Sequence, residues 1–122
     1  MPPATELLFV YGTLRRGSTR GGFAARLEAE AAWLGAAQVR GSLYQVHPDY
    51  PGLVEPQDEN DWITGEVWEF ADPALWAALD LYEGAEYVRV RRAVIMANGE
   101  RREAWIYLYA SKITKAMAIV AV

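Results

Sequence analysis

The sequence contains no cysteine, and His47 is the only histidine among its 122 residues. Disulfides, thiolate nucleophiles and cysteine-based zinc sites are therefore excluded together. His47 precedes a proline in an expected loop, with no nucleophile pattern nearby, which disfavours a catalytic triad. The acidic residues Asp58, Glu59 and Asp61 lack the spacing of a calcium-binding loop and are expected to be solvated. We therefore predict neither a metal nor a cofactor.

Long apolar runs and an excess of basic charge are also missing. No run approaches the roughly 18 residues needed to span a bilayer, and the first residues do not resemble a signal peptide. The 12 lysines and arginines are outnumbered by 16 aspartates and glutamates, which gives a net charge of −4 and argues against binding along a nucleic-acid backbone. We therefore expect a cytoplasmic protein with a small-molecule partner, and no nucleic acid or membrane partner.

The remaining composition is sufficient for one compact domain. Hydrophobic residues make up 52% of the chain and aromatic residues 12%, which is enough to fill a core at this length. No internal repeat, low-complexity segment or linker divides the chain. We therefore expect a single domain over residues 1–122, and we assign no role to the apolar tail, residues 112–122.

Strand patterns dominate the chain. Strand-forming residues bounded by turn signals occur in residues 6–11, 38–46, 61–70, 87–96 and 101–110. The pair Asn98-Gly99 favours a tight hairpin turn between the last two. Gly41 and Gly65 interrupt two other strands, which is typical of strands that bend within a curled sheet. The proline-rich segment 47–55 is expected to be an irregular loop.

Two further stretches have helical spacing. In residues 23–34 apolar side chains recur at near-helical intervals, and Gly35 is expected to end the helix. In residues 72–82 Asp72 can cap the helix, and the apolar side chains share one face. Together with the strands, these helices predict an α+β fold with a small mixed sheet.

The first predicted strand ends in a turn that becomes basic at once. The turn consists of Tyr11, Gly12, Thr13 and Leu14, followed by Arg15 and Arg16. A strand end that bends sharply exposes successive backbone N–H groups, which can bind an anion or a developing oxyanion. Glycine permits close approach, and the arginines add positive potential for a carboxylate-bearing ligand. The alternative is an ordinary turn in which Thr13 caps a helix and the arginines are solvated.

Glu83 is an acid in an unfavourable place, the carboxyl end of the second predicted helix. The helix dipole disfavours a negative charge there by roughly 0.3–1 kcal/mol. Partial burial would act in the same direction, and both effects raise the pKa of a carboxyl toward the range of a general base. The alternative is an exposed acid beside Glu86. A hydrolase that pairs Glu83 with Glu66 or Asp80 is less favoured, because Asp80 precedes it by one turn of the same helix.

Tyrosines of the last two strands are candidates for lining a pocket. Tyr87 and Arg89 are two residues apart on one strand and point the same way, as do Tyr107 and Tyr109 on the other. The alternative is a core or cross-strand ladder of aromatic rings, which we favour for Tyr109.

Five sequence blocks are spread over residues 7–110: VYGTLRRG, GSLYQVHPDYPGLV, GEVWEF, LDLYEGAEYVRV and AWIYLY. In order and spacing they resemble the gamma-glutamylcyclotransferase-like family. The combination of blocks is far more specific than any one of them. The resemblance implies a small mixed β-sheet curled into a partial barrel with flanking helices.

The resemblance also implies an enzyme, an amide-cleaving cyclotransferase that needs no cofactor. The α-amine of a gamma-glutamyl substrate would attack its own γ-carbonyl, releasing 5-oxoproline and an amine or amino acid. Glu83 matches the family's acid/base glutamate, residues 11–14 its substrate-binding loop, and Tyr87 and Tyr107 its pocket tyrosines. Whether the loop holds the α-carboxylate or the γ-carbonyl oxygen stays open. The alternative is a non-catalytic module that binds a small carboxylate metabolite in the same pocket.

Overall fold

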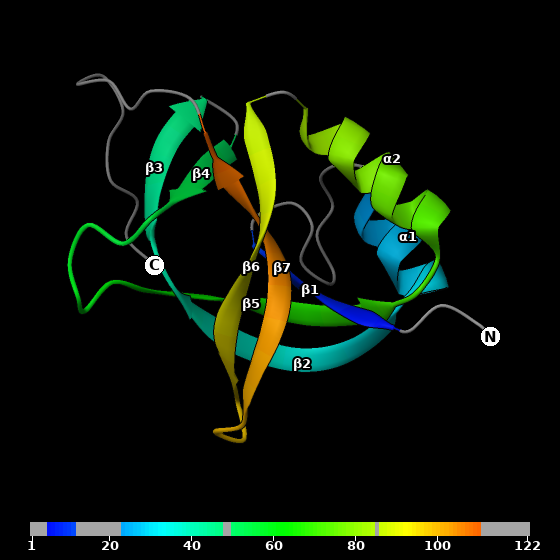
Figure 1. The fold of residues 1–122 in the computed structure, drawn as a ribbon, viewed down its shortest axis with the longest axis horizontal. Coiled ribbons are helices and arrows are strands. Elements are labelled where there is room, and N and C mark those ends of the chain that lie inside the picture. The colour runs from blue at the N-terminus through cyan, green and yellow to red at the C-terminus, as the bar shows by residue number, and fades with distance from the viewer. Residues whose placement is uncertain (1–4, 12–22, 48–49, 85, 111–122) are drawn as a thin grey trace.

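Five strands close into a mixed barrel in the computed structural model, which describes residues 5–11, 23–47, 50–84 and 86–110 (Figure 1). Their order around the barrel is β1 (Glu6–Val10), β5 (Trp62–Phe70), β2 (Ala32–Arg40), β6 (Tyr87–Met96) and β7 (Arg101–Tyr109). Neighbouring strands are antiparallel except β1 and β7, whose parallel pairing of Leu8 with Trp105 closes the ring. The predicted curled, mixed sheet is therefore confirmed, and its closure is complete.

The hairpin of β6 and β7 forms as its turn residues predict. The two strands pair from Tyr87 with Tyr109 to Ile95 with Arg101. Gly99 adopts a φ of +86°, the left-handed conformation that a tight turn requires and that glycine tolerates best.

A second, two-stranded sheet corrects the sequence prediction between residues 38 and 55. The expected strand 38–46 is in fact the end of β2 and most of β3 (Ser42–His47), and the expected loop 47–55 contains β4 (Tyr50–Val54). Gly41 is the corner between β2 and β3, and a Cβ there would lie 2.7 Å from the Leu53 side chain. The chain therefore changes sheets at Gly41, where the lack of a side chain lets it pass close to β4.

The first helix is shorter than its spacing predicts. α1 spans Phe23–Glu30, and β2 begins at Ala32, so the prediction of helix over residues 31–34 is wrong. Trp33 pairs with Trp68 of β5, and the register then shifts so that Gly35, with a φ of +126°, pairs with Val67. Gly35 thus marks a bulge in a strand instead of a helix end. Pairing with β5 has overridden the local helical spacing.

The second helix, α2 (Pro73–Glu83), forms as predicted. The Asp72 side chain accepts a hydrogen bond from the backbone N–H of Ala74 at 2.9 Å, which caps the first turn. Leu75 and Leu79 are fully buried. Gly84 ends the helix with a φ of +87°.

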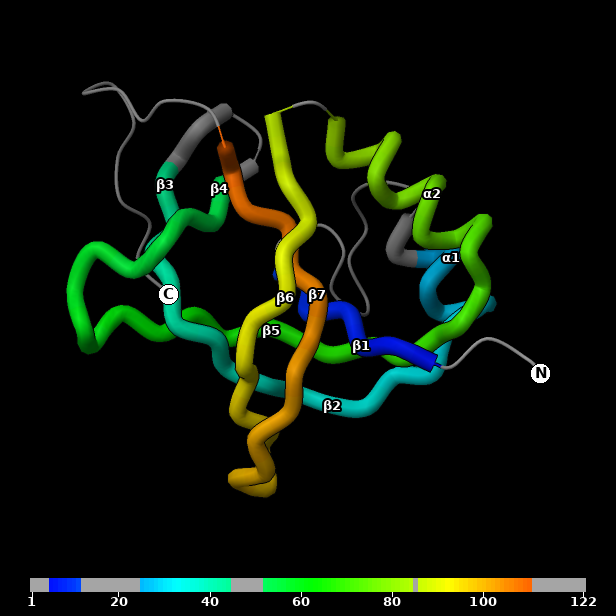
Figure 2. The backbone as a smooth tube through the Cα atoms, in the orientation of Figure 1, coloured from blue at the N-terminus to red at the C-terminus, as the bar shows by residue number. Residues whose placement is uncertain are grey.

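Two hydrophobic cores hold these elements together. Side chains that alternate inward along the strands fill the barrel, with Phe9, Val67 and Ile106 among them. Side chains on the outward faces of β1, β5 and β7 pack beneath the helices, which lie together on one side of the barrel (Figure 2). Tyr107 belongs to this second core and so faces α2. Among the described helices, none is long and apolar enough to cross a membrane.

Candidate active site

The carboxyl end of α2 and the start of β6 form a tight corner that carries two of the predicted site residues. Glu83 is the last residue of α2, and Tyr87 is the first residue of β6. The Gly84 N–H donates to the carbonyl oxygen of Asp80 at 3.2 Å, and the Tyr87 N–H donates to that of Gly84 at 3.3 Å. These bonds fix Glu83 and Tyr87 relative to each other.

Glu83 is half-buried, and its surroundings alter its acidity. Burial raises the pKa of Glu83 from 4.5 to about 7, because the charged carboxylate loses solvation. The negative charge of Glu83 in turn contributes to raising the pKa values of Tyr11 and Tyr107, after burial as the main cause for each. The fold therefore brings Glu83 within electrostatic reach of two other predicted site residues.

Tyr11 joins three strands at the end of β1. Its hydroxyl donates to the carbonyl oxygen of Tyr107 at 3.2 Å and accepts from the backbone N–H of Leu53 at 3.0 Å. Tyr11 thereby ties β1 to β7 and β4. The other predicted residues of this turn, Gly12, Thr13 and Leu14, lie outside the described residues, as do Arg15 and Arg16.

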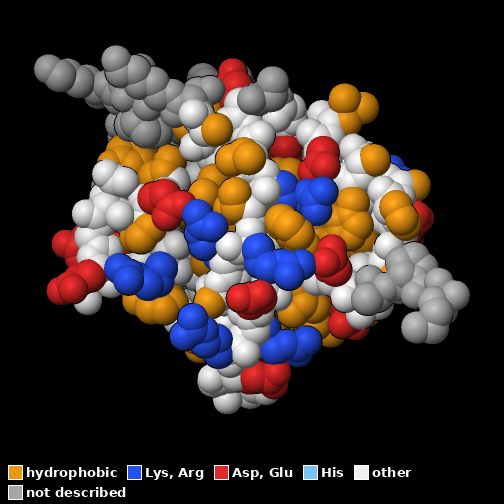
Figure 3. Space-filling model, viewed as in Figure 1, with side chains coloured by type: hydrophobic (Ala, Val, Ile, Leu, Met, Phe, Trp, Pro, Cys, Tyr) orange, Lys and Arg blue, Asp and Glu red, His pale blue; other side chains and the backbone are white. Residues whose placement is uncertain are grey.

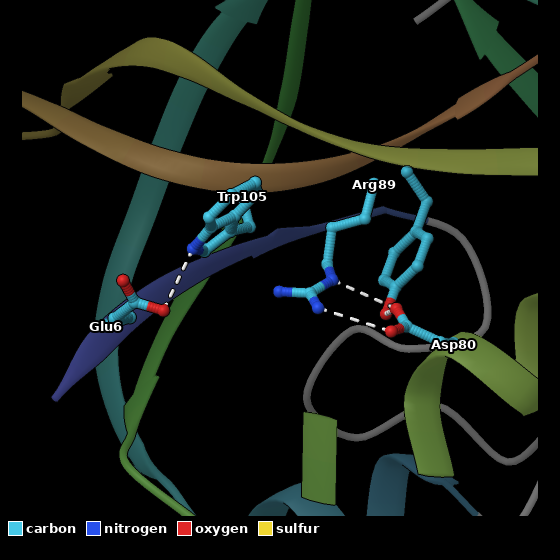
Figure 4. Close-up of polar contacts among 5 residues, drawn as sticks. Glu6, Asp80, Arg89 and Trp105 are labelled. Carbon is cyan, nitrogen blue, oxygen red and sulfur yellow. Dashed lines mark hydrogen bonds and ion pairs between the residues drawn. The ribbon is translucent and has the colours of Figure 1, made fainter. Parts of the chain in front are cut away.

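Tyr107 is bound to an acid that no sequence pattern linked to it. Its hydroxyl donates to Asp80 Oδ1 at 2.7 Å. Asp80 also accepts from Nε and Nη2 of Arg89, at 2.9 and 3.2 Å (Figure 4). Although partial burial opposes ionisation, these hydrogen bonds hold the pKa of Asp80 below its usual value. Burial and the Asp80 carboxylate together raise the pKa of Tyr107.

Arg89 is held between two tryptophans. Its guanidinium carbon lies 4.6 Å from the ring centroid of Trp76 and 4.9 Å from that of Trp105, distances at which cation–π attraction is effective. The Trp105 indole donates to Glu6 at 3.1 Å, and Arg91 pairs with the same acid at 2.8 Å. Basic and acidic side chains lie interspersed over the β6–β7 hairpin on the face shown in Figure 3. No sequence motif signalled the two tryptophans.

An open groove of about 390 Å³ runs beside this network. It is lined by Asp80, Tyr87, Val88, Arg89, Trp105 and Tyr107. Tyr87 and Tyr107 thus line the same groove, whereas Glu83 and Tyr11 are not among its lining residues. The Tyr109 ring packs edge-on against Tyr87 with centroids 5.5 Å apart, which confirms the cross-strand ladder favoured for Tyr109.

The described part of the chain gathers no group of three or more His, Cys, Asp or Glu side chains that could hold a metal ion. His47 is the last residue of β3, so the expectation of a loop at this position is wrong. The functional groups that do converge are one carboxylate of raised pKa, two tyrosines and a paired aspartate. They provide acid/base chemistry and hydrogen bonds.

Substitution of Glu83 by glutamine is expected to stabilise the protein at high pH. The pKa of Glu83 is about 7 in the folded protein against 4.5 for a solvated glutamate. As pH rises from 4.5 to 7, the unfolded chain releases this proton before the folded chain does, so the wild type loses stability. The loss is complete above about pH 7 and amounts to at most about 3 kcal/mol, at about 1.4 kcal/mol per pH unit. Glutamine carries no such charge.

Urea unfolding of the wild type and Glu83→Gln at several values between pH 5 and 8 measures this effect. The difference in unfolding free energy should grow with pH and level off near pH 8. Glu86→Gln is the matched control, because Glu86 is exposed. A difference for Glu83→Gln that stays constant over this range would contradict the burial of its charge.

The architecture defines the class of protein first: a mixed five-stranded barrel with two short helices on one side. This is the fold of an AIG2-like protein from Mus musculus, whose crystal structure matches with a TM-score of 0.75 over 89% of this chain and 80% of that one, at 24% identity. The sequence then identifies the family. Residues 8–120 match the family model described as gamma-glutamyl cyclotransferase, AIG2-like, and the chain belongs to this family.

Two relatives are similar in sequence as well. The Drosophila melanogaster protein CG2811, provisionally named a gamma-glutamylcyclotransferase, is 31% identical over 111 residues, which cover 83% of this chain and 68% of that protein. The crystal structure of YkqA from Bacillus subtilis matches with a TM-score of 0.69 and 31% identity. That match covers 87% of this chain but only 36% of YkqA, so the chain spans about a third of that protein.

Proposed function

We propose that this protein is a cyclotransferase that cleaves a gamma-glutamyl amide, with Glu83 as its acid and base. The observation that carries the proposal is a half-buried Glu83, with a pKa raised to about 7, within electrostatic reach of Tyr11 and Tyr107 in a chain of this family. A carboxyl group of that pKa can both take and return a proton near neutral pH.

In the proposed reaction the substrate supplies its own nucleophile. Glu83 takes a proton from the α-amine, whose nitrogen forms a bond to the γ-carbonyl carbon. As the amide C–N bond breaks, Glu83 gives the proton to the departing nitrogen. The products are 5-oxoproline and an amine or amino acid, and the carboxylate of Glu83 is regenerated.

Ring closure explains why so few catalytic groups are needed. Because nucleophile and carbonyl belong to one molecule, correct folding of the substrate can supply on the order of 7 kcal/mol or more of the barrier reduction. The protein's tasks are then to hold the substrate curled, to stabilise the developing oxyanion and to move one proton. We assign the curling and oxyanion roles to the turn of residues 11–14 and the pocket role to Tyr87 and Tyr107.

Asp80 is a poor candidate for the acid/base role. Its carboxylate accepts hydrogen bonds from Arg89 and Tyr107, which lower its pKa. A carboxylate stabilised in this way is a weak base, since its charged form is favoured. This argues against a paired-acid hydrolase and favours one proton carrier.

The purified protein should release 5-oxoproline from at least one member of a panel of gamma-glutamyl amino acids and gamma-glutamyl amines. Chromatography with mass detection should identify 5-oxoproline as the product, since hydrolysis would give free glutamate instead. Release of glutamate, or no turnover across the panel, would overturn the proposal. Thermal stabilisation by carboxylate metabolites without any product, retained in Glu83→Gln, would instead favour the non-catalytic binding module.

A further inference from the structure

The hydroxyl hydrogen of Tyr107 is used in a hydrogen bond to the carboxylate of Asp80. The Tyr107 side chain is buried, and its oxygen lies 2.7 Å from Asp80 Oδ1. An ionised carboxylate can only accept hydrogen bonds, so the tyrosine must be the donor. The remaining lone pairs of the Tyr107 oxygen can therefore only accept from a ligand.

Arg89 makes this direction stable. It holds both carboxylate oxygens of Asp80 in a two-pronged pair, a geometry that favours the ionised acid. The guanidinium of Arg89 lies over the rings of both Trp76 and Trp105, and the Arg89 side chain is only 25% exposed. The Asp80 side chain, 46% exposed, is thus oriented by a better-buried partner.

The Tyr107 hydroxyl is bound to Asp80, which lies three residues before the proposed proton carrier, Glu83, on the same face of α2. The carbonyl oxygen of Tyr107 accepts from the Tyr11 hydroxyl, and the charge of Glu83 contributes to raising the pKa of the Tyr107 phenol. The Tyr107 side chain lines the groove together with Asp80 and Arg89. Tyr107 is therefore the link between the Asp80–Arg89 pair and Glu83.

We propose that Asp80 is a positioning residue of this site, which with Arg89 turns the Tyr107 hydroxyl so that its oxygen accepts a hydrogen bond from the substrate's α-amino group. The inference rests on the proposed function. An amino group arrives with hydrogens to donate, whereas a carbonyl or carboxylate oxygen would need a donor. A hydroxyl locked as an acceptor, and bound to the acid one helical turn before Glu83, therefore favours the amine and holds it on the side of α2 that carries Glu83.

A double-mutant cycle tests the proposal, with kcat/KM measured on a gamma-glutamyl compound that the wild type converts to 5-oxoproline. Tyr107→Phe removes the acceptor and should lower kcat/KM by about 10-fold, the effect of a hydrogen bond to a charged group. Asp80→Asn should cause a similar loss, because an amide can donate and allow the hydroxyl to turn. The double variant should be no worse than Tyr107→Phe alone, whereas independent residues would multiply to about 100-fold. Multiplying losses would overturn the proposal.

Arg89→Lys and Arg91→Lys form a matched pair of variants. Both arginines stack on Trp105, but only Arg89 holds Asp80. Arg89→Lys should lower kcat/KM several-fold and lose this effect in a Tyr107→Phe background, while Arg91→Lys should leave kcat/KM unchanged. Equal losses of kcat/KM in both variants would overturn the role of Arg89, because they would show that any change of an arginine on Trp105 lowers activity.

A spectroscopic arm needs no turnover. With tyrosine labelled at ring carbon Cζ, Tyr107→Phe identifies one of the resonances of the 7 tyrosines. Asp80→Asn should shift that resonance in the folded protein, and Glu86→Gln should not. An unshifted resonance would overturn the proposal even in an active enzyme. A wild type that releases no 5-oxoproline would overturn the proposed function instead. The Tyr107 resonance would still show whether Asp80 orients the Tyr107 hydroxyl.

Discussion

Replacement of Glu83 by glutamine is expected to lower kcat by about 10²–10⁴-fold, the usual contribution of a positioned acid or base. Glutamine has nearly the same shape and keeps hydrogen-bonding capacity, but it cannot carry a proton between the amine and the leaving nitrogen. The wild type should show the matching pH dependence. Because Glu83 must be ionised to act as a base and its pKa is about 7, kcat/KM should fall as pH drops below about 7.

The control for this prediction is Glu86→Gln, which removes an exposed acid on the same corner of the chain. It should retain wild-type kcat and pH dependence. Steady-state rates of 5-oxoproline release from pH 5 to 9 provide the measurement for both variants. Full activity in Glu83→Gln would exclude Glu83 as the proton carrier, and a folded, inactive variant with raised stability at pH 8 would support it.

Replacement of Gly65 by alanine is expected to cost about 3 kcal/mol of folding stability or more, the upper range for overpacking a core. Gly65 lies in β5 beside the end of β1, one residue past the pairing of Glu66 with Val10. A Cβ at this position would overlap the carbonyl oxygen of Val10 and come within 2.6 Å of the Phe9 ring. Backbone cannot move aside as a flexible side chain can, so β1 and β5 must separate locally. Urea unfolding at one pH measures the loss.

Gly99→Ala provides the comparison. Gly99 has a φ of +86°, and apart from its two chain neighbours no described residue has an atom within 4 Å of the place that an alanine methyl would take. The cost is therefore backbone strain alone, about 1 kcal/mol. A loss for Gly65→Ala no larger than that for Gly99→Ala would show that β1 and β5 separate easily at this position.

Local sequence patterns predicted the parts of the fold whose local and tertiary preferences agree. The hairpin around Asn98-Gly99 and the capped helix after Asp72 formed as expected. The prediction of helix for residues 31–34 was wrong because these residues pair with β5, with a bulge between Trp33 and Gly35, and this pairing outweighs their helical spacing. The prediction of a loop for residues 47–55 was wrong because β4 is stabilised mainly by pairing with β3, and a local sequence pattern does not reveal such a partner.

For the candidate site too, the sequence indicated the features that depend on local position and missed those that depend on tertiary contacts. Glu83 was recognisable because an acid at a helix end is locally unfavourable, and the structure gives it burial and a raised pKa. The attachment of Tyr107 to Asp80 was not, because it joins α2 to β7 over a long sequence separation. The stacking of Arg89 on Trp76 and Trp105 likewise depends on side chains from three different elements.

The corner between α2 and β6 restricts how this site can be re-engineered. Each residue of an α-helix advances by about 100° around its axis, so one insertion in α2 ahead of Glu83 would rotate the acid away from Tyr11 and Tyr107. Variation of loop length, a common way to new specificity, would therefore disrupt the site if it were made at the corner between α2 and β6. Libraries that seek new leaving groups should keep residues 80–89 at constant length and diversify positions on other elements.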